Sequence, residues 1–344
     1  MRMEQTKVSL AGLDAQIREW LREQSGSRNG VLITEMIRTL VKLAADGTSR
    51  GDLKILNRTL KELRRAFKVF APYSTVRKVS IFGSTHIKES DPYYHLARDL
   101  AQRLAQEGLM VITGAGPGIM QAGHEGAGPE HSFGVNIRLP TVQPANRFIK
   151  DNSKLMSFHF FFTRKLMFVK EADAVVIFPG GFGTHDELSE SLTLAQTGKS
   201  QIVPIILMDL PGEAYWKGWE RFVREAMLGR RYIAGNEFSF FKIMDNIAAA
   251  IGEIQTFYRN FHSYRFVRHD LVIRLNHSPT PALIDTLNQD FADIFKGGKI
   301  QQTEPLAEEA DDPSALHLPR LRVPFNREDF ARLRQMIDVI NREG

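Results

Sequence analysis

The sequence contains no cysteine among its 344 residues. Disulfides, thiolate zinc sites and cysteine nucleophiles are therefore excluded, and because this agrees with a reducing compartment we expect a cytoplasmic protein. No uninterrupted apolar run approaches the ~20 residues that a membrane helix requires, so no membrane association is expected. The first residues, MRMEQTKVSLAGLDAQ, carry acids early and lack an apolar stretch, which predicts that they are not a secretory signal.

Three common ligand-binding patterns are also missing. The run Gly114-Ala115-Gly116-Pro117-Gly118 departs from the dinucleotide spacing G-x-G-x-x-G because Ile119 holds the sixth position, and Arg138 stands where an acid would meet ribose. No Gly-Lys-Ser/Thr follows either glycine-rich turn, which disfavours hydrolysis of nucleoside triphosphates. The histidines show no H-x-E or H-x-x-x-H spacing, so no metal site is predicted.

The basic surplus lies at the N-terminal end. Residues 1–75 hold 14 Lys and Arg against 8 Asp and Glu, whereas the whole chain carries a net charge of +5. The charges alternate in sign along the segment, as on solvated helix faces, so nucleic-acid binding is disfavoured. Apolar residues recur at helical spacing in three stretches and predict three helices within residues 9–70. They are Leu10, Leu13, Ile17 and Leu21; then Leu32, Ile33, Met36, Ile37, Leu40 and Leu43; then Leu53, Leu56, Leu60, Leu63 and Phe67.

These apolar stripes require a covering surface, and we expect a homo-oligomer, a dimer or higher.

From residue 76 the pattern changes to strands alternating with helices of 10–15 residues. This alternation predicts an α/β fold with a doubly wound, mainly parallel, Rossmann-like sheet. The expected strands are 78–85, 109–113, 133–137, 175–178, 202–208 and 238–244, and helices are expected at 163–171, 212–227 and 246–261, with others after Asp91, Gly118 and Gly183.

Three parts of the chain are expected: an N-terminal helical segment (1–75), the Rossmann-like domain (76–261) and a small α/β appendage (262–344). In the appendage we predict strands at 271–275 and 320–324, a helix at 281–295, and a last helix capped by Asn326 with Asp329 as its third-position acid. The acidic stretch Glu304–Asp312 is predicted to be a mobile connection.

Ligands of such sheets bind beyond the carboxyl ends of the strands. Glycine-bearing turns follow Phe82, Thr113 and Phe178, and the last of them, Pro179-Gly180-Gly181-Phe182-Gly183-Thr184, leads directly into a helix. Backbone N–H groups of this turn and the Thr184 hydroxyl are suited to hold a phosphate, with Glu187 one turn further along and close to a sugar. The competing interpretation is a capping box, in which Thr184 caps the helix and Glu187 returns to the cap.

Arg164 and Lys165 lie on the helix before the central strand, and as isolated basic residues they would be surface charges. With the motifs around them, however, the chain resembles the Lonely Guy (LOG) family, whose members are often mislabelled lysine decarboxylases. The motifs are PGGFGTHDE at 179–187, Arg164-Lys165 before it, GAGPGIMQA at 114–122, the Phe82-Gly83-Ser84 turn and Ala195-Gln196-Thr197-Gly198. The resemblance covers about residues 76–255. No lysine stands in a pyridoxal phosphate motif.

The resemblance implies a phosphoribohydrolase that cleaves nucleoside 5′-monophosphates, purine or pyrimidine nucleotides or cytokinin ribotides, into free base and ribose 5-phosphate. It implies Arg164 and Glu187 as the catalytic pair. It further implies substrate or phosphate contacts at Gly83, Ser84, Gly114, Gly116, Gly118, Met120, Lys165, Gly180, Gly181, Gly183 and Thr184. Family members commonly have Met-His-x before Arg-Lys, and Phe161, Phe162 and Thr163 stand there in this chain, which leaves the base open.

The residue types suit this chemistry, because breaking an N-glycosidic bond builds positive charge on ribose and a carboxylate beside the sugar stabilises it. No metal or organic cofactor is needed. Two alternatives without catalysis stay open. One is a carrier that holds a phosphorylated pterin, as molybdenum cofactor carriers do on a similar sheet, and the other is a nucleotide sensor acting through the terminal segments.

Overall fold

The computed structural model describes residues 12, 15–16, 19, 29–140 and 144–344. The predicted stripe of Leu10, Leu13, Ile17 and Leu21 lies outside the described residues. The chain divides into two units, residues 1–61 and 62–344. In the first, α2 spans Gly30–Ala45 and α3 begins at Arg50; α3 ends at Phe70, inside the second unit, and a 3₁₀ turn follows at Ala71–Tyr73.

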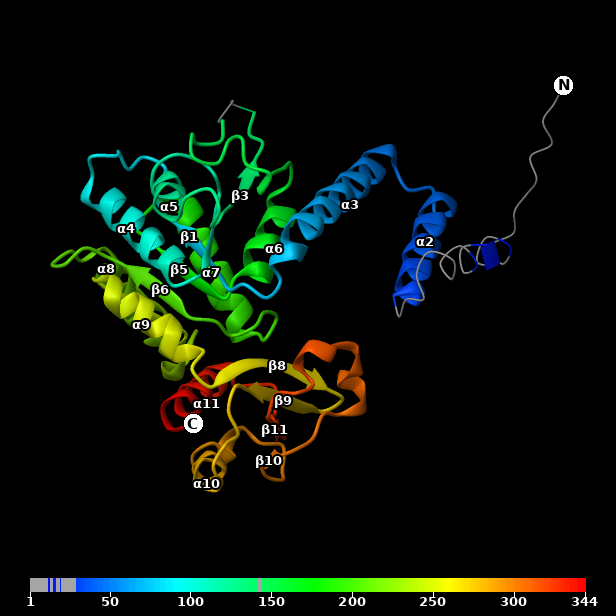
Figure 1. Ribbon diagram of the computed structural model, residues 1–344, viewed down its shortest axis with the longest axis vertical. Coiled ribbons are helices and arrows are strands. Elements are labelled where there is room, and N and C mark those ends of the chain that lie inside the picture. The colour runs from blue at the N-terminus through cyan, green and yellow to red at the C-terminus, as the bar shows by residue number, and fades with distance from the viewer. Residues whose placement is uncertain (1–11, 13–14, 17–18, 20–28, 141–143) are drawn as a thin grey trace. The chain divides into compact units, whose positions relative to one another are not determined.

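The second unit contains a seven-stranded sheet, ordered β4-β3-β2-β1-β5-β6-β7, in which every pair is parallel. This confirms the predicted doubly wound α/β sheet (Figure 1). The strands are β1 (Lys78–Phe82), β2 (Met110–Thr113), β3 (Ser132–Ile137), β4 (Leu155–Phe158), β5 (Ala174–Ile177), β6 (Ile205–Met208) and β7 (Phe241–Met244). The helices are α4 (Pro92–Gln106), α5 (Ile119–Ala127), α6 (Phe161–Glu171), α7 (Phe182–Gln196), α8 (Tyr215–Phe222) and α9 (Ile247–Phe257).

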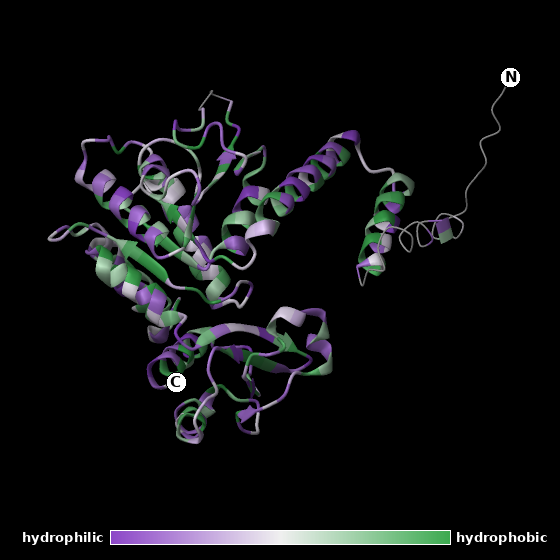
Figure 2. Ribbon diagram, viewed as in Figure 1, coloured by the Kyte–Doolittle hydropathy of each residue, from purple (hydrophilic) through white to green (hydrophobic). Residues whose placement is uncertain are grey.

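Alternation along the strands builds one core on each face of this sheet. In β5, Val176 packs with α4, α5 and α9, whereas Val175 and Ile177 pack with the end of α3 and with α6, α7 and α8. A strand buried on both faces is hydrophobic along its whole length, which is how β6 appears in Figure 2. Asp91 caps α4, accepting a hydrogen bond from the Tyr93 N–H, and Pro92 is its first residue, both as predicted.

The appendage belongs to the same unit. It contains a four-stranded antiparallel sheet ordered β10-β11-β9-β8. Its elements are β8 (Phe261–Val267), β9 (Asp270–Leu275), α10 (Pro281–Asp290), β10 (Gln301–Gln302), β11 (Arg320–Val323) and α11 (Phe330–Glu343), with 3₁₀ turns at Ala292–Ile294, Ala307–Asp311 and Pro313–Ala315. Its apolar core extends to Ala195 of α7 and to Ile202.

Several predicted boundaries are wrong. The helix expected to reach residue 261 ends at Phe257, and Phe261 opens β8. The helix expected at 212–227 is α8 followed by a π-helical turn at Val223–Leu228. Residues 238–240 of the strand expected at 238–244 belong to a 3₁₀ turn, Gly235–Phe240. The helix expected to run to residue 295 ends at Asp290 and is followed by a 3₁₀ turn. The last helix is capped by Asp329, not Asn326.

The acidic stretch is ordered at its centre, contrary to the predicted mobility. Glu309 is fully buried and pairs with Arg274 of β9 at 2.9 Å and with Arg320 of β11 at 2.8 Å. Two guanidinium groups compensate for the loss of solvent around one carboxylate, which a stretch of consecutive acids does not reveal.

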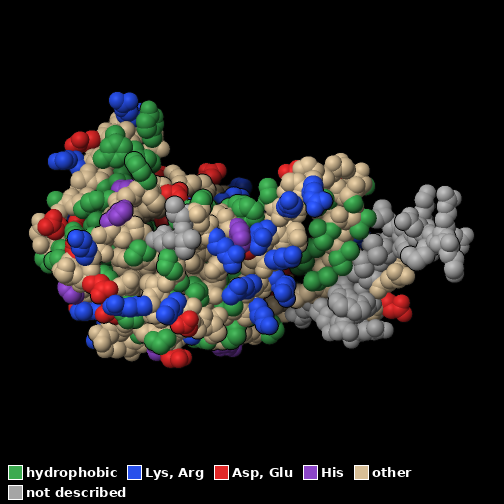
Figure 3. All heavy atoms as spheres, turned by 90° about the horizontal axis from the view of Figure 1, so that it is seen from above, with side chains coloured by type: hydrophobic (Ala, Val, Ile, Leu, Met, Phe, Trp, Pro, Cys, Tyr) green, Lys and Arg blue, Asp and Glu red, His purple; other side chains and the backbone are tan. Residues whose placement is uncertain are grey.

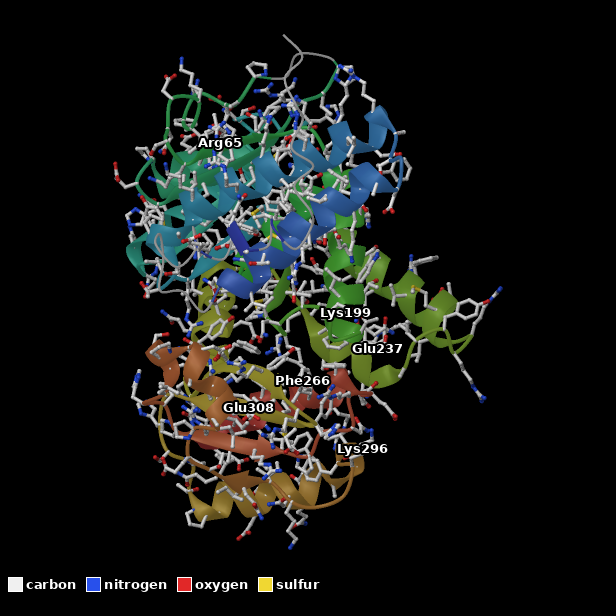
Figure 4. All side chains as sticks on the ribbon, turned by 90° about the vertical axis from the view of Figure 1, so that its right-hand side faces the viewer. Arg65, Lys199, Glu237, Phe266, Lys296 and Glu308 are labelled. Atoms are coloured by element: carbon white, nitrogen blue, oxygen red, sulfur yellow. The ribbon has the colours of Figure 1, made fainter. Side chains whose placement is uncertain are left out.

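A cleft of about 1010 Å³ separates the two sheets at the amino ends of β1, β5 and β6. Lys199, after α7, and Phe266 of β8 line it from opposite sides (Figure 4).

Basic side chains are exposed on the surface. α3 carries exposed Arg64, Arg65 and Lys68, and lysine and arginine side chains gather on the face that Figure 3 shows. Within the described residues, no helix is long and apolar enough to cross a membrane.

Candidate active site

Three loops meet at the carboxyl edge of the parallel sheet, where the turns after β1, β2 and β5 end side by side. The Ser84 N–H donates to the Pro179 carbonyl at 3.1 Å, and the Ile119 N–H donates to the Ser84 carbonyl at 3.1 Å. Gly118 has φ +68° and its α-carbon faces the Ser84 carbonyl so closely that a side chain would be only 2.3 Å from it. Ser84 therefore joins the other two turns.

The turn after β5 is built for close approach. A Cβ on Gly180 would lie 2.1 Å from Thr184 Oγ1 and 2.9 Å from the Ser84 nitrogen, so only glycine fits there. Gly181 and Gly183 instead face open space. The helix α7 begins at Phe182 with Gly181 as its N-cap and no side-chain cap. The N–H groups of Thr184 and His185 donate to the Gly181 carbonyl at 3.0 and 3.1 Å, so the N–H groups that precede them are the ones without a partner inside the helix. This is the geometry of an anion site at a helix N-terminus.

The capping-box interpretation of Thr184 and Glu187 is wrong. Thr184 is the third residue of α7, inside the helix and buried, so it does not cap it. Glu187 lies one turn further along, 9% exposed, with its carboxylate 3.5 Å from Lys165 Nζ. Burial raises the pKa of Glu187, and the positive charges of Lys165 and Arg164 only partly oppose this.

Arg164 reaches the same edge from α6. Its Nε donates to the Val135 carbonyl of β3 at 2.8 Å, and the guanidinium carbon lies 5.1 Å from the ring centre of Phe168. A Cβ on Gly114 would be 2.2 Å from Arg164 Nη2 and 2.6 Å from Met120 Sδ. The missing side chain at Gly114 thus makes room for the guanidinium. Burial lowers the pKa of Arg164, and Glu187 opposes that shift.

Lys165 lies among three carboxylates of α7. Its Nζ is 2.8 Å from Asp186, 3.5 Å from Glu187 and 2.7 Å from Glu190. Burial alone would lower the pKa of Lys165, but the hydrogen bonds to Asp186 and Glu190 outweigh it and raise it. The structure therefore places Lys165 as a counter-charge beside Glu187.

The remaining predicted residues support the loop after β2. Gly83 packs on Ile119, where a Cβ would be 2.7 Å from Cγ1, and the Gly116 carbonyl accepts from Asn146 Nδ2 at 3.0 Å. Asn146 also contacts His124 Nδ1 at 3.1 Å, while His124 Nε2 lies 3.0 Å from Thr113 Oγ1. His124 is fully buried, which lowers its pKa to about 4. This neutral network braces Ala115, whose φ of +61° is uncommon outside glycine.

Sequence reasoning missed Asn146 and Tyr215. The Tyr215 hydroxyl donates to the Gly180 carbonyl and lies 2.8 Å from His185 Nε2, so α8 braces the glycine turn. Asp209, at the end of β6, accepts from the Trp216 N–H at 3.2 Å and so fixes the start of α8. Neither Asn146 nor Tyr215 belongs to a recognisable local motif. Tyr215 contacts His185, and Asn146 contacts Gly116, each across 30 positions of the chain.

All the predicted site residues therefore lie along one edge, on the turns after β1, β2 and β5 and on the first turns of α5, α6 and α7. The edge combines backbone N–H groups and a guanidinium, which suit an anion, with a buried carboxylate. Among the residues that the structure describes, no three His, Asp or Glu side chains are placed to hold a metal ion.

Known proteins have sequences similar to this part of the chain. A family model described as "possible lysine decarboxylase" matches residues 116–254. The pyrimidine/purine nucleotide 5′-monophosphate nucleosidase of Escherichia coli K12 is 30% identical over 158 residues, which are 42% of this chain and 34% of that protein. The chain thus spans about a third of that relative's length.

Two further similarities concern a smaller relative and a solved structure. The cytokinin riboside 5′-monophosphate phosphoribohydrolase LOG3 of Arabidopsis thaliana is 29% identical over 160 residues, 45% of this chain and 71% of that protein. The molybdenum cofactor binding protein of Rippkaea orientalis is similar at 19% identity and a TM-score of 0.37, over 53% of this chain and 96% of that one. The family-model match and the two sequence relatives confirm the resemblance deduced from the motifs: the parallel-sheet domain of this chain is similar to LOG-type proteins.

Proposed function

We propose that the parallel-sheet domain hydrolyses the N-glycosidic bond of nucleoside 5′-monophosphates, giving free base and ribose 5-phosphate. The observation that carries this proposal is the position of Glu187. Its carboxylate is buried next to Lys165, on the same helix whose first turn presents the open glycine positions Gly181 and Gly183. A phosphate site and a carboxylate are thus one helical turn apart.

The division of labour follows from charge. The 5′-phosphate binds at the turn 180–184 and Arg164, because both present N–H groups to an anion. Binding energy from this non-reacting group holds the ribose in place during the chemical step. Glu187 lies beside the sugar, where it stabilises the positive charge that develops as the bond to the base breaks.

The reaction balances with water alone. The oxygen of one water molecule forms the new bond to the anomeric carbon, and the electron pair of the broken bond leaves with the base nitrogen. One proton of the water goes to the departing base. Glu187 acts in this scheme as an ionised group, so its raised pKa sets an acid limit to activity.

A nucleotide screen tests the proposal directly. The purified chain is incubated with AMP, GMP, CMP and a cytokinin ribotide, and free base and ribose 5-phosphate are quantified by chromatography. Release of both products in equal amounts from at least one nucleotide supports the proposal and identifies the preferred base. Absence of base release from all four at high protein concentration overturns it.

We also propose that the chain assembles with further copies of itself. Large apolar side chains are exposed on α2, among them Val31 (68%) and Leu32 (58%), and Phe182 at the start of α7 is 97% exposed. Such side chains favour burial against a second surface. Light scattering coupled to size-exclusion chromatography gives the mass in solution, and a monomer at micromolar concentration would contradict the proposal.

A further inference from the structure

A buried carboxylate outside the motifs meets the beginning of α6. Glu62 of α3 is only 7% exposed. Its Oε1 accepts from the His159 N–H at 2.9 Å and lies 3.0 Å from His159 Nδ1, and its Oε2 accepts from the Thr163 hydroxyl at 2.7 Å. His159 precedes α6 and Thr163 is its third residue, so one carboxylate bonds to both sides of the helix start.

The local sequence adds one contact at this helix start, from the Thr163 hydroxyl to the Phe160 carbonyl at 3.0 Å. The N-cap position is Phe160, which has no side-chain acceptor. Within the described part of the chain no lysine or arginine pairs with Glu62, so the hydrogen bonds from His159 and Thr163 are what offset the burial of its charge. The positive end of the α6 dipole also favours a carboxylate there.

Glu62 is itself held in place by the core. One turn further along α3, Ala66 is fully buried, and the Phe70 ring stacks on Phe133 of β3 with 4.4 Å between ring centres. Arg65 Nη2 donates to the Leu155 carbonyl at the start of β4 at 3.2 Å. The carboxylate is therefore attached to a helix end that cannot shift without disturbing the sheet.

We infer that Glu62 is a positioning residue for Arg164. Thr163 immediately precedes Arg164, so the bond from Glu62 sets the rotation of α6 that brings the guanidinium over Gly114 and to the Val135 carbonyl. The inference rests on the proposed function for its catalytic consequence. It goes beyond that function because Glu62 touches neither the glycine turn nor any catalytic group.

The test compares four variants of the full chain. Glu62→Gln keeps the shape but loses one acceptor oxygen, and Thr163→Val removes the hydroxyl at nearly constant volume. Thr163→Ser keeps the hydroxyl and serves as the conservative rescue. Glu309→Gln is the matched control, because Glu309 is also a buried glutamate but lies in the appendage.

With the preferred nucleotide, Glu62→Gln and Thr163→Val should each lower kcat by about ten- to a hundredfold, and KM should change less than threefold. This is the loss in rate expected when a catalytic group moves by up to about an ångström. The double variant should lose no more than the more affected single one, because both remove the same contact. Thr163→Ser should restore kcat to within threefold. Glu309→Gln should lower Tm and leave kcat unchanged.

Hydrogen–deuterium exchange provides a readout that does not depend on turnover. Amides of residues 160–166 should exchange at least about threefold faster in Glu62→Gln and not in Glu309→Gln. If the wild-type chain releases no base, the proposed function fails, and the exchange result alone decides whether Glu62 holds α6. Unchanged exchange at these amides, or an active Glu62→Gln enzyme with kcat within twofold of wild type, overturns the inference.

Discussion

The two ends of the parallel sheet both carry buried charges, but they use them differently. At the amino end, Lys78 pairs with Glu171 at 3.7 Å and Arg77 with Asp173 at 3.6 Å. At the carboxyl end, Arg164 bonds to a backbone carbonyl, and within the described residues no carboxylate lies within 4.0 Å of its guanidinium. A guanidinium without an ionic partner is available to an anionic ligand, whereas a paired one mainly supports the fold.

The cleft at the amino end of the sheet is also lined by paired charges. It is a large hollow, yet Arg274, which lines it, is paired with Glu309 at 2.9 Å and Asp312 at 2.7 Å. The carboxyl end offers instead a helix N-terminus with open glycine positions and a carboxylate whose pKa is raised. Chemistry is therefore expected where the Arg164 guanidinium and the start of α7 can meet an anion next to a buried carboxylate, and hollow volume by itself does not indicate it.

The largest expected effect separates two glutamates at opposite ends of the parallel sheet, Glu187 and Glu171. Glu187→Gln should lower kcat by about 10³-fold, because a group that stabilises transition-state charge is lost, while AMP binding measured by calorimetry stays within threefold. Glu171→Gln, at the amino end, should lower Tm and leave kcat within twofold. Full activity in Glu187→Gln would show that the carboxylate has no catalytic role.

Arg164 and Arg77 test the same difference between the carboxyl and amino ends of the sheet. Arg164→Lys should lower kcat/KM by about 100-fold, because lysine cannot donate to Val135 and present a flat fork to a phosphate at once. Arg77→Lys, whose partner is Asp173, should change kcat/KM less than twofold. Steady-state kinetics with AMP measure both, and equal losses would remove the distinction between the two ends.

Two glycines of one turn are expected to differ as well. Gly180→Ala should lower Tm and raise KM about tenfold, because its Cβ would meet Thr184 and Ser84. Gly183→Ala has open space and gains helix propensity of up to about 1 kcal/mol, so its Tm should not fall. If the phosphate lies in that space, KM for AMP still rises about tenfold. An unchanged KM in Gly183→Ala would move the phosphate away from this turn.

The smallest expected effect concerns pH. Because the pKa of Glu187 is raised above its ordinary value near 4.5, the acid limb of the kcat profile should lie above that pH. Lys165→Met should move this limb higher, because it removes a positive charge.

The raised pKa of Glu187 also affects stability. It means that the fold favours the protonated form, so stability falls as pH rises through the folded-state pKa. Glu187→Gln should therefore gain a few °C in Tm at pH 8 relative to wild type, and less at pH 5. A pH–rate profile and melting curves check both signs.

Part of this arrangement was predictable from local patterns. Strand and helix alternation, the Asp91 cap and the three glycine turns depend on neighbouring residues, and they were found where expected apart from shifted ends. The capping-box prediction was wrong for a local reason. Gly180 and Gly181 end the turn at once, so α7 begins before Thr184 and takes it into the helix.

The missed features depend on distant partners. β4 has only four residues, and β8, with seven, lies directly after the helix that was expected to run to residue 261. Glu309 looked like part of a solvated acidic stretch, but Arg274 and Arg320 arrive from two strands of the appendage sheet. The braces of the site, Tyr215 and Asn146, likewise come from elements whose pairing no local pattern reveals.

The sequence by itself determined most of the order of the elements, the resemblance to the LOG family and the residues at the turns, because apolar periodicity and glycine positions act over a few residues. Only the tertiary structure decided which charges are partnered. Glu62 meets Thr163 across 101 positions, Lys165 meets Glu190 across 25, and Arg164 reaches Val135 across 29. Burial makes those partnerships decisive, because a charge removed from water must find its hydrogen bonds wherever the fold brings a donor or acceptor to it.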